Sequence, residues 1–197
     1  TMTWPRHIIL SLFPGIDLLG KAFEQAGYCV VRGPDKLWGG DIRQFKPPPD
    51  VFWGIIAGSP CQDFSKLRRT PPTGNGLAML REFTRCVTSA SPEWWLLENV
   101  PGVPSVTHRS QIDGYVTQRF HIDQSWFCDV SRLRHIQYGS KSGRLLAPPI
   151  GKAVTVRHGA ALASDTRTVT ELKKLQGLPP DFRLSPFTVR GAKRASG

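Results

Sequence analysis

Residues 51–62 read Val51-Phe52-Trp53-Gly54-Ile55-Ile56-Ala57-Gly58-Ser59-Pro60-Cys61-Gln62. The first seven of them carry no polar side chain, which is typical of a strand buried on both faces of a parallel sheet. A polar turn with Cys61 follows at once. A second apolar segment, Trp94 to Leu97, ends in the same way, with Glu98 and Asn99. Because the carboxyl ends of parallel strands meet at one edge of a sheet, we expect the thiol and the carboxylate to lie close together.

Strand-like and helix-like segments alternate on either side of this stretch. The expected strands are Ile8–Phe13, Tyr28–Val31, Val51–Ala57 and Trp94–Leu97, and the expected helices are Leu18–Ala26 and Leu77–Ala90. This βαβ alternation predicts an α/β fold, a parallel sheet with helices on both faces. Two further segments, Tyr115–Phe120 and His121–Phe127, are expected to form an antiparallel hairpin or edge strands.

The composition favours one folded domain. The chain has 197 residues, of which 40% are hydrophobic, enough for a sizeable core. No apolar run is long enough to span a membrane. The cysteines show no paired spacing, so neither a disulfide framework nor a zinc site is expected, no metal is assigned, and a reducing cytoplasm is the simplest setting. Three of them, Cys29, Cys86 and Cys128, are expected to be small buried hydrophobic residues.

Positive charge is concentrated in the last third of the chain. Residues 131–197 contain 13 Lys and Arg against 3 Asp and Glu, a net charge of +10 out of +11 for the whole chain. Such asymmetry indicates a surface that faces a polyanion such as a nucleic acid. A solvated basic tail would explain the charge as well, but this region also contains apolar segments such as Leu172 to Leu178.

The first expected strand ends in a turn that suits a nucleotide-like ligand. Gly15 allows the backbone to approach a ligand, and the following helix offers unbonded N–H groups. Asp35 is placed to bond ribose hydroxyls and Asp41 an adenine amine, although both acids could equally be turn or cap residues. The residues expected to bind this ligand are Phe13, Pro14, Gly15, Ile16, Asp17, Asp35, Asp41, Ile42 and Pro60.

The thiol and the acid suit the alkylation of a pyrimidine carbon. A thiolate at Cys61 is a soft, strong nucleophile that can add to C6 of cytosine and make C5 enamine-like. Glu98 can protonate or hydrogen-bond N3, and Asn99 can help to hold the edge of the base. Arg132 and Arg134 alternate, so on a strand they would point to one face, where they could bind a base oxygen and a phosphate.

A basic loop follows the thiol and contains residues that permit a hinge. It could close over DNA once a base has been flipped out of the helix, or it could be an ordinary surface loop. The residues expected to contact nucleic acid are Gln62, Ser65, Lys66, Arg68, Arg69, Asn99 and Gln176.

Taken together, these motifs resemble the cytosine-C5 DNA methyltransferases. The matching segments are Ile9–Gly20 (cofactor loop), Ser59–Ser65 (nucleophile), Glu98–Val100 (acid), Arg132–Arg134 (arginine pair) and Glu171–Pro179 (penultimate motif). The resemblance implies a class I methyltransferase sheet, S-adenosylmethionine as methyl donor, base flipping in double-stranded DNA and a covalent adduct between Cys61 and C6. It also implies Cys61, Glu98, Arg132 and Arg134 as catalytic residues.

The chain departs from the family pattern at several places. Ser11 replaces an acid, Asp17 replaces a glycine and could either clash with the carboxylate of the cofactor or bind its ammonium group, and Val130 replaces a glutamine. Only residues 139–167 occupy the place of a target-recognition region.

These departures shape the expected organisation and function. We expect residues 1–138 to form the catalytic and cofactor-binding domain, 139–167 a vestigial recognition region, and 168–197 a shortened C-terminal part of the catalytic domain. The prediction is a DNA methyltransferase of low sequence selectivity, or one that takes selectivity from a partner protein. An RNA methyltransferase and a non-catalytic DNA-binding relic are the alternatives.

Overall fold

The computed structural model describes residues 8–66, 68–106, 112–127, 130–148, 157–158, 166–175, 178–179 and 181–182. The chain divides into two compact units. One comprises residues 1–121 and 134–147, and the other residues 122–133 and 148–197.

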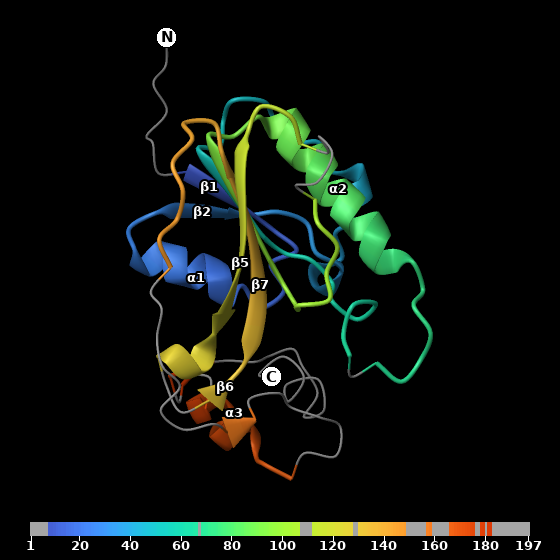
Figure 1. Ribbon diagram of the computed structural model, residues 1–197, viewed down its shortest axis with the longest axis vertical. Helices are drawn as coiled ribbons and strands as arrows, with labels where there is room; N and C mark the ends of the chain where they lie inside the picture. The colour runs from blue at the N-terminus through green and yellow to red at the C-terminus, as the bar shows by residue number, and fades with distance from the viewer. Residues whose placement is uncertain are drawn as a thin grey trace. The chain divides into compact units, whose positions relative to one another are not determined.

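A six-stranded sheet is the centre of the first unit (Figure 1). Its strand order is β2-β1-β3-β4-β7-β5. The bounds are Cys29–Arg32 for β2, Ile8–Leu12 for β1, Gly54–Gly58 for β3, Trp94–Asn99 for β4, Leu133–Ser140 for β7 and Val116–Asp123 for β5. The first four of these strands pair in parallel, and β7 is antiparallel to β4. Parallel neighbours place the ends of β1, β2, β3 and β4 at one edge, as the sequence predicted.

Two helices cover opposite faces of this sheet. Alternate residues of each strand point to opposite faces. Leu10, Ile55 and Trp95 therefore share a core with α2 (Asn75–Ala90), whereas the neighbouring residues in sequence, among them Ile9 and Ile56, pack on the other side. Helix α1 (Leu18–Gln25) covers that other side with Leu19 and Phe23. Figure 1 shows α1 and α2 on the two sides of the sheet, so the expected α/β layering is confirmed.

Two tryptophans of β4 fit against glycines in the adjacent strands. A Cβ atom at Gly54 of β3 would collide with the indole of Trp94, and one at Gly139 of β7 would collide with that of Trp95. Trp94 also stacks on Phe23, which joins α1 to the sheet. The glycines therefore make room for two large aromatic anchors, one on each face.

Some element boundaries differ from the sequence prediction. Strand β3 begins at Gly54 instead of Val51, and α2 begins at Asn75, two residues before Leu77. Of the two alternatives expected for residues 115–127, the hairpin is wrong and an edge strand is found: β5 is a single strand at the edge of the sheet, followed by the short 3-10 helix η3 (Gln124–Trp126). The reason is local, because residues 115–127 contain no glycine, proline or asparagine that would reverse the chain.

The second unit contains shorter elements. A parallel pair joins β6 (Val130–Ser131) to β8 (Arg157–His158), and α3 spans Val169–Leu175. Helix α3 starts with a capping box, in which the amide of Thr168 donates to the Glu171 carboxylate and the amide of Glu171 donates to the Thr168 hydroxyl. No helix in the described part of the chain is both long and apolar enough to cross a membrane.

Candidate active site at the carboxyl ends of the strands

A cavity of about 90 Å³ lies beyond the carboxyl ends of β1, β2 and β3. It is lined by Phe13, Pro34, Asp35, Lys36, Gly40, Asp41, Ile42, Pro60, Asn75 and Met79. Five residues expected to bind a nucleotide-like ligand are therefore brought together there: Phe13, Asp35, Asp41, Ile42 and Pro60. Asn75 and Met79 were missed by the sequence analysis. They stand one turn apart at the start of α2, and only the order of the strands brings that helix to this edge.

The two acids of the cavity have structural partners as well. Asp35 Oδ1 accepts from the amide of Leu37, and Asp41 Oδ1 accepts from the amide of Arg43. Each acid thus caps a short 3-10 helix, η1 (Lys36–Trp38) or η2 (Ile42–Gln44). A carboxylate can accept about four hydrogen bonds, so these caps leave acceptor sites for a ligand. The two interpretations of these residues as caps and as ligand-binding groups are compatible.

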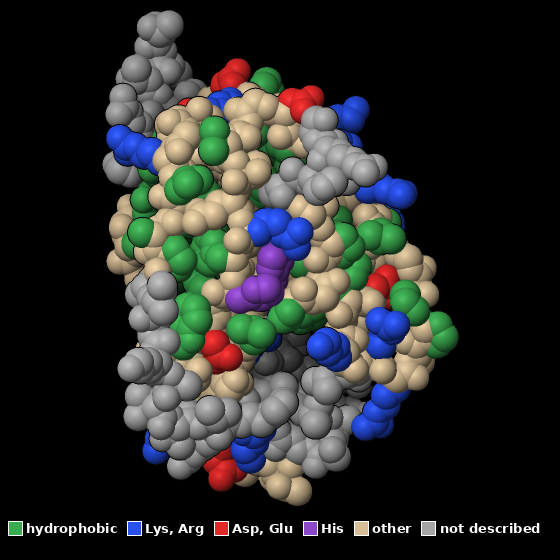
Figure 2. Space-filling view, viewed as in Figure 1, with side chains coloured by type: hydrophobic (Ala, Val, Ile, Leu, Met, Phe, Trp, Pro, Cys, Tyr) green, Lys and Arg blue, Asp and Glu red, His purple; other side chains and the backbone are tan. Residues whose placement is uncertain are grey.

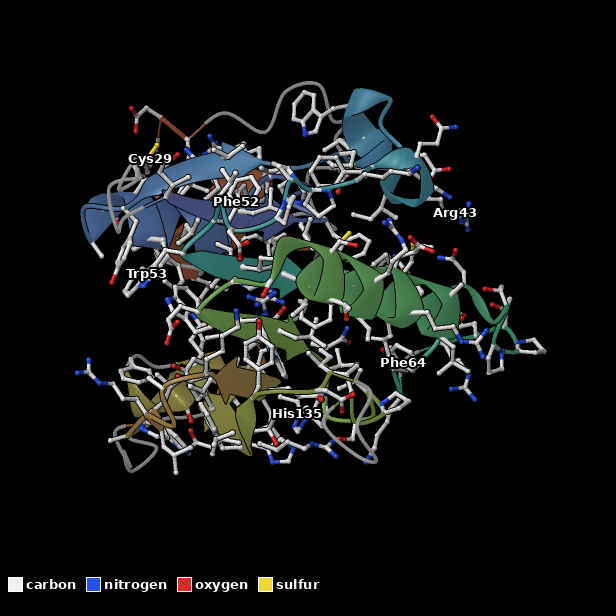
Figure 3. All side chains as sticks on the ribbon, turned by 90° about the horizontal axis from the view of Figure 1, so that it is seen from above. Cys29, Arg43, Phe52, Trp53, Phe64 and His135 are labelled. Carbon is white, nitrogen blue, oxygen red and sulfur yellow. The ribbon has the colours of Figure 1, made fainter. Side chains whose placement is uncertain are left out.

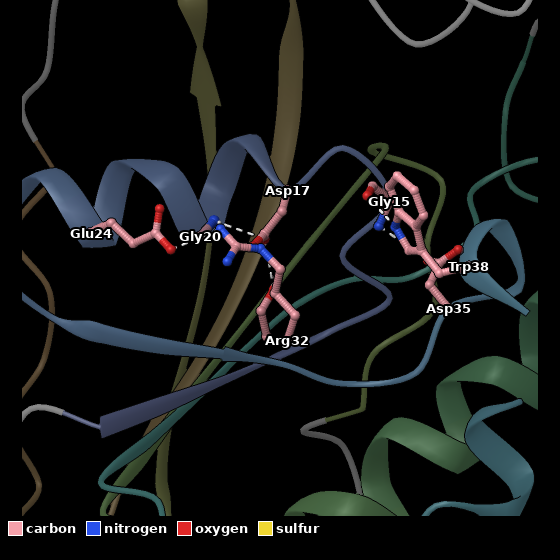
Figure 4. A network of polar contacts seen from close by, with 8 residues as sticks. Gly15, Asp17, Gly20, Glu24, Arg32, Asp35 and Trp38 are labelled. Atoms are coloured by element: carbon pink, nitrogen blue, oxygen red, sulfur yellow. Dashed lines mark hydrogen bonds and ion pairs between the residues drawn. The ribbon is translucent and has the colours of Figure 1, made fainter. Parts of the chain in front are cut away.

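The turn after β1 is fastened to the region after β2 (Figure 4). The Gly15 amide donates to Asp35 Oδ2 at 3.1 Å, and the indole Nε1 of Trp38 donates to the Gly15 carbonyl at 3.1 Å. Pro14, Gly15, Ile16 and Asp17 are not among the residues that line the cavity. The turn therefore stands next to the cavity and shares Asp35 with it.

Asp17 lies below this turn and is almost completely buried, with 4% of its surface exposed. Its Oδ1 accepts from the Ser11 hydroxyl at 2.8 Å and from the Gly20 amide at 3.1 Å. Its Oδ2 forms an ion pair with Arg32 Nε at 2.8 Å. Ser11 and Asp17, two positions at which the chain departs from the family pattern, thus contact each other.

Cys61 starts a compact loop after β3. Its carbonyl accepts from the amides of Phe64 and Ser65, at 2.9 and 3.0 Å, and its side chain is partly exposed. The Asp63 carboxylate accepts from the amides of Thr73 and Gly76, at 2.9 and 2.8 Å. Since Gly76 lies in the first turn of α2, Asp63 ties the loop of Cys61 to the start of this helix.

Glu98 lies on the strand beside that loop. In the β3–β4 pairing Gly58 is the partner of Glu98, and a Cβ atom at Gly58 would stand 3.7 Å from Glu98 Oε2. Arg134 Nε forms an ion pair with Glu98 Oε1 at 2.8 Å. The carboxylate is therefore held between β7 and the end of β3, and Cys61 follows that strand end by three residues.

Asn99 fixes the same region from within. It is buried, and its Nδ2 donates to the carbonyl and to the hydroxyl of Ser59, at 3.0 and 2.8 Å. The amide of Val100 donates to Asn99 Oδ1. Through these bonds the Asn99 side chain joins the end of β4 to the loop of Cys61.

The expected arrangement of the arginine pair is wrong. Arg134 lies in β7, but Arg132 lies between β6 and β7 and belongs to the second compact unit. Around Arg132, the Asp123 carboxylate accepts from the Arg132 amide and the Gln124 amide donates to the Arg132 carbonyl. These bonds break the strand at Arg132, so the two arginines do not alternate along one strand.

The residues expected to contact nucleic acid are mostly exposed. Gln62, Lys66, Arg68 and Arg69 are exposed and Ser65 is partly buried. Arg68 donates to the Asp63 carbonyl at 3.1 Å, so one basic side chain is folded back on its own loop. Gln176 lies outside the described residues.

A cluster around His135 was not predicted. Arg119 Nε donates to His135 Nε2 at 3.1 Å, and the His121 ring lies 4.9 Å from the His135 ring. Burial lowers the pKa of His135 to about 4, with the charges of Arg119 and His121 acting in the same direction. Figure 2 shows histidine and basic side chains together on this face. Single histidines in a sequence give no signal of such a pairing between strands.

The cysteines other than Cys61 have different environments. Cys86 is buried, as expected, and burial raises the pKa of its thiol to about 11. The expectation for Cys29 is wrong, because it lies exposed on the outer strand β2 (Figure 3). Strand β2 is an edge strand, with β1 as its neighbour on one side only, so its side chains are less covered than those of the central strands. Cys128 lies outside the described residues.

Comparison with known proteins identifies a family that this chain matches. Residues 25–122 match the family described as C-5 cytosine-specific DNA methylase. The type II methyltransferase M.NgoFVII of Neisseria gonorrhoeae is 32% identical over 129 residues, which are 55% of this chain and 34% of that protein. The type II methyltransferase M.DdeI of Desulfomicrobium norvegicum is 28% identical, over 52% of this chain and 30% of that protein. The chain thus spans about a third of the length of these curated relatives.

A solved structure has the same fold. It is described as a putative DNA modification methyltransferase encoded within a prophage of E. coli, and it matches with a TM-score of 0.58 at 18% identity, over 84% of this chain and 54% of that one. This likeness confirms the expected methyltransferase sheet. The family follows from the sequence matches: the matched family model and the type II methyltransferases show that the chain belongs to the cytosine-C5 methyltransferase family.

Proposed function

We propose that this chain acts as a DNA methyltransferase that transfers a methyl group to C5 of cytosine in double-stranded DNA. One observation carries the proposal: the loop of Cys61 and the strand end with Glu98 are joined directly. Gly58 pairs with Glu98 across the β3–β4 ladder, and Asn99 bonds Ser59 two residues before Cys61. A nucleophile and an acid that are held by adjacent strand ends can act on the same ring.

In the proposed reaction the Cys61 thiolate attacks C6 of a flipped cytosine and forms a carbon–sulfur bond. Glu98 donates a proton or a hydrogen bond to N3, which accepts the electron pair released by the attack, and C5 becomes nucleophilic. After C5 has gained its methyl group, loss of the C5 proton and cleavage of the C6–sulfur bond restore the aromatic ring. Arg134 holds the Glu98 carboxylate in position, and Asn99 holds the loop of Cys61.

The residues around the cavity fit S-adenosylmethionine. Asp35 and Asp41 supply acceptors for ribose hydroxyls and for an adenine amine, and Phe13, Ile42 and Met79 supply an apolar wall for the base. When bound there, this cofactor supplies an electrophilic methyl group. Pro60 belongs to the cavity wall and precedes Cys61, so the cofactor site and the nucleophile share one turn.

Contact with DNA is assigned to the exposed loop after Cys61 and to the basic last third of the chain. Lys66, Arg69 and Gln62 are exposed beside the nucleophile. In this proposal residues 1–138 and 168–197 form the catalytic part, and 139–167 replace a full recognition region. We expect low sequence selectivity, or selectivity supplied by a partner protein, and action in the cytoplasm. Arg132 is assigned to the phosphate backbone.

The decisive experiment is covalent trapping on duplex DNA that contains 5-fluorocytosine, with S-adenosylmethionine present. The wild-type chain is expected to form an adduct that survives denaturation, because fluorine at C5 cannot leave as a proton does. Cys61→Ser is expected to abolish the adduct and to lower methylation by more than about 10³-fold. Cys29→Ser is the matched control, since Cys29 is an exposed thiol on strand β2, away from the loop of Cys61.

The same preparation distinguishes the alternatives. Bisulfite mapping of methylated DNA is expected to show many sequence contexts, and a single long recognition site would contradict low selectivity. Methylation of tRNA without methylation of duplex DNA would replace DNA by RNA as the substrate. If neither an adduct nor cofactor binding is found, the chain is a non-catalytic relic.

A further inference from the structure

The turn after β1 is strained. Phe13, Gly15 and Asp17 have φ angles of +53°, +52° and +56°. Side chains disfavour this left-handed region, so two of the three residues hold it at a cost in free energy. Such a conformation persists only where surrounding contacts enforce it. In this turn the Asp17 amide donates to the Pro14 carbonyl at 2.6 Å, which closes the turn tightly.

The contacts that enforce the turn converge on the Asp17 carboxylate. It accepts from Ser11 in the preceding strand and from Gly20 in the following helix, and it pairs with Arg32 in the neighbouring strand (Figure 4). Arg32 is itself anchored by Glu24 of α1, at 2.7 Å from Nη2 to Oε1. One carboxylate thus connects β1, α1 and β2 beneath the turn.

Helix α1 packs closely against the Asp17 carboxylate. A Cβ atom at position 20 would collide with all three atoms of the Asp17 carboxylate group. Gly20 is buried, so the first turn of α1 closes directly over the acid. The carboxylate is therefore enclosed by donors and backbone and is not directed into the cavity.

We propose that Asp17 is the positioning residue of the cofactor-binding turn, and that Ser11 and Arg32 act through it. The inference rests on the proposed S-adenosylmethionine site. Ser11 and Asp17 then represent a single coupled change from the family pattern, in which a carboxylate has moved from the strand to the turn while a donor has taken its place. Asp17 fixes the Gly15 amide and carbonyl beside Asp35 and does not itself bind the ammonium group of the cofactor.

The proposal is tested by titrating the full chain with S-adenosylmethionine. Asp17→Gly removes the carboxylate and relieves the φ strain, and it is expected to weaken binding about tenfold because the turn is no longer preorganised. The transposed double variant Ser11→Asp/Asp17→Gly is expected to bind within about threefold of the wild type. In methylation assays the single variant should raise KM with a smaller change in kcat.

Asp17→Asn keeps the proposal testable if the double variant does not fold. Asparagine tolerates the left-handed region and retains an acceptor for Ser11 and Gly20, so binding is expected to weaken by about threefold, less than with glycine. If Asp17 contacted the ammonium group directly, asparagine and glycine would weaken binding equally and Ser11→Asp would restore nothing. That result overturns the proposal, as does a glycine variant that binds like the wild type.

Failure of the proposed function gives a different result. If the wild-type chain itself does not bind S-adenosylmethionine, the cofactor assignment is wrong. If the wild type binds and the variants show no difference, only the role of Asp17 is wrong.

Discussion

The turns after β1 and β3 use the same device in different surroundings. Each places an aspartate carboxylate so that it accepts amides at the start of the following helix. Asp17 reaches Gly20, three residues ahead, whereas Asp63 reaches Gly76, thirteen residues ahead. Asp17 is 4% exposed and paired with Arg32, while Asp63 is only partly buried and bonds Thr73 as well.

The two aspartates therefore hold their turns in different ways, one in the interior and the other near solvent. The Asp17 network lies in the interior, where an unsatisfied charge is costly, so it affects the stability of the sheet as well as the turn. The Asp63 network lies near solvent, where the same bonds contribute less to stability. It fixes the loop that carries Cys61, so its effect is expected mainly in catalysis.

The largest effect is expected from removing the counter-ion of Asp17. Arg32→Met leaves a buried carboxylate without its cation, and the free energy of unfolding is expected to fall by about 3 kcal/mol in urea titrations at pH 7. Arg43→Met is the control, because Arg43 pairs at 3.5 Å with Asp41, whose side chain is 33% exposed, whereas that of Asp17 is only 4% exposed. This control is expected to cost less than about 0.5 kcal/mol. Equal losses would show that burial does not distinguish the two networks.

An intermediate effect is expected from His135, a buried polar group without a counter-ion. Its pKa of about 4 in the folded protein lies below the ordinary value of 6.5. The folded state therefore resists protonation, so its stability is complete above pH 6.5 and falls by about 2 kcal/mol as the pH decreases toward 4. In urea titrations at pH 7 and pH 4.5, His135→Gln is expected to lose this difference.

His121→Gln is the matched control for that measurement, since His121 is exposed and contacts the same ring. The dependence on pH should persist in it. A wild type whose stability did not change between these two pH values would contradict the assignment of a neutral buried imidazole.

The smallest effect on stability, with a separate effect on turnover, is expected from the loop of Cys61. Asp63→Ala releases the loop from α2, and kcat is expected to fall about tenfold while the KM for S-adenosylmethionine stays unchanged. Asp113→Ala, an exposed acid elsewhere, is the control. A rise in KM at constant kcat would place Asp63 with the cofactor turn and break the distinction between the two turns.

The bonds of the Asp63 carboxylate to Thr73 and Gly76, which anchor the loop of Cys61 to α2, are sensitive to acid. The amide of Thr73, followed by that of Gly76, holds the pKa of Asp63 below its ordinary value of 3.8. Because the folded pKa is the lower one, the anchor is complete at neutral pH and is lost only as the pH falls below that value. Activity measurements near pH 7 therefore report the intact anchor.

The sequence predicted the order of the main elements because each has a clear local pattern. The apolar run before Cys61 and the segment Trp94–Leu97 became the central strands β3 and β4. Spacing did not reveal that Arg132 leaves the strand, since the Asp123 carboxylate that interrupts it lies nine residues away. Nor did it place Asn75 and Met79 in the cavity wall, which depends on how α2 packs on the sheet.

The sequence by itself determined which chemical groups follow the strands: a thiol, an acid, a glycine turn and two further acids. These follow from residue type and local spacing, which do not require knowledge of the packing. Only the tertiary structure decided that Ser11, Asp17 and Arg32 form one buried network and that Asn99 fastens the loop of Cys61. Hydrogen bonds and ion pairs between strands depend on the register and burial of the whole sheet, and no short stretch of sequence encodes either.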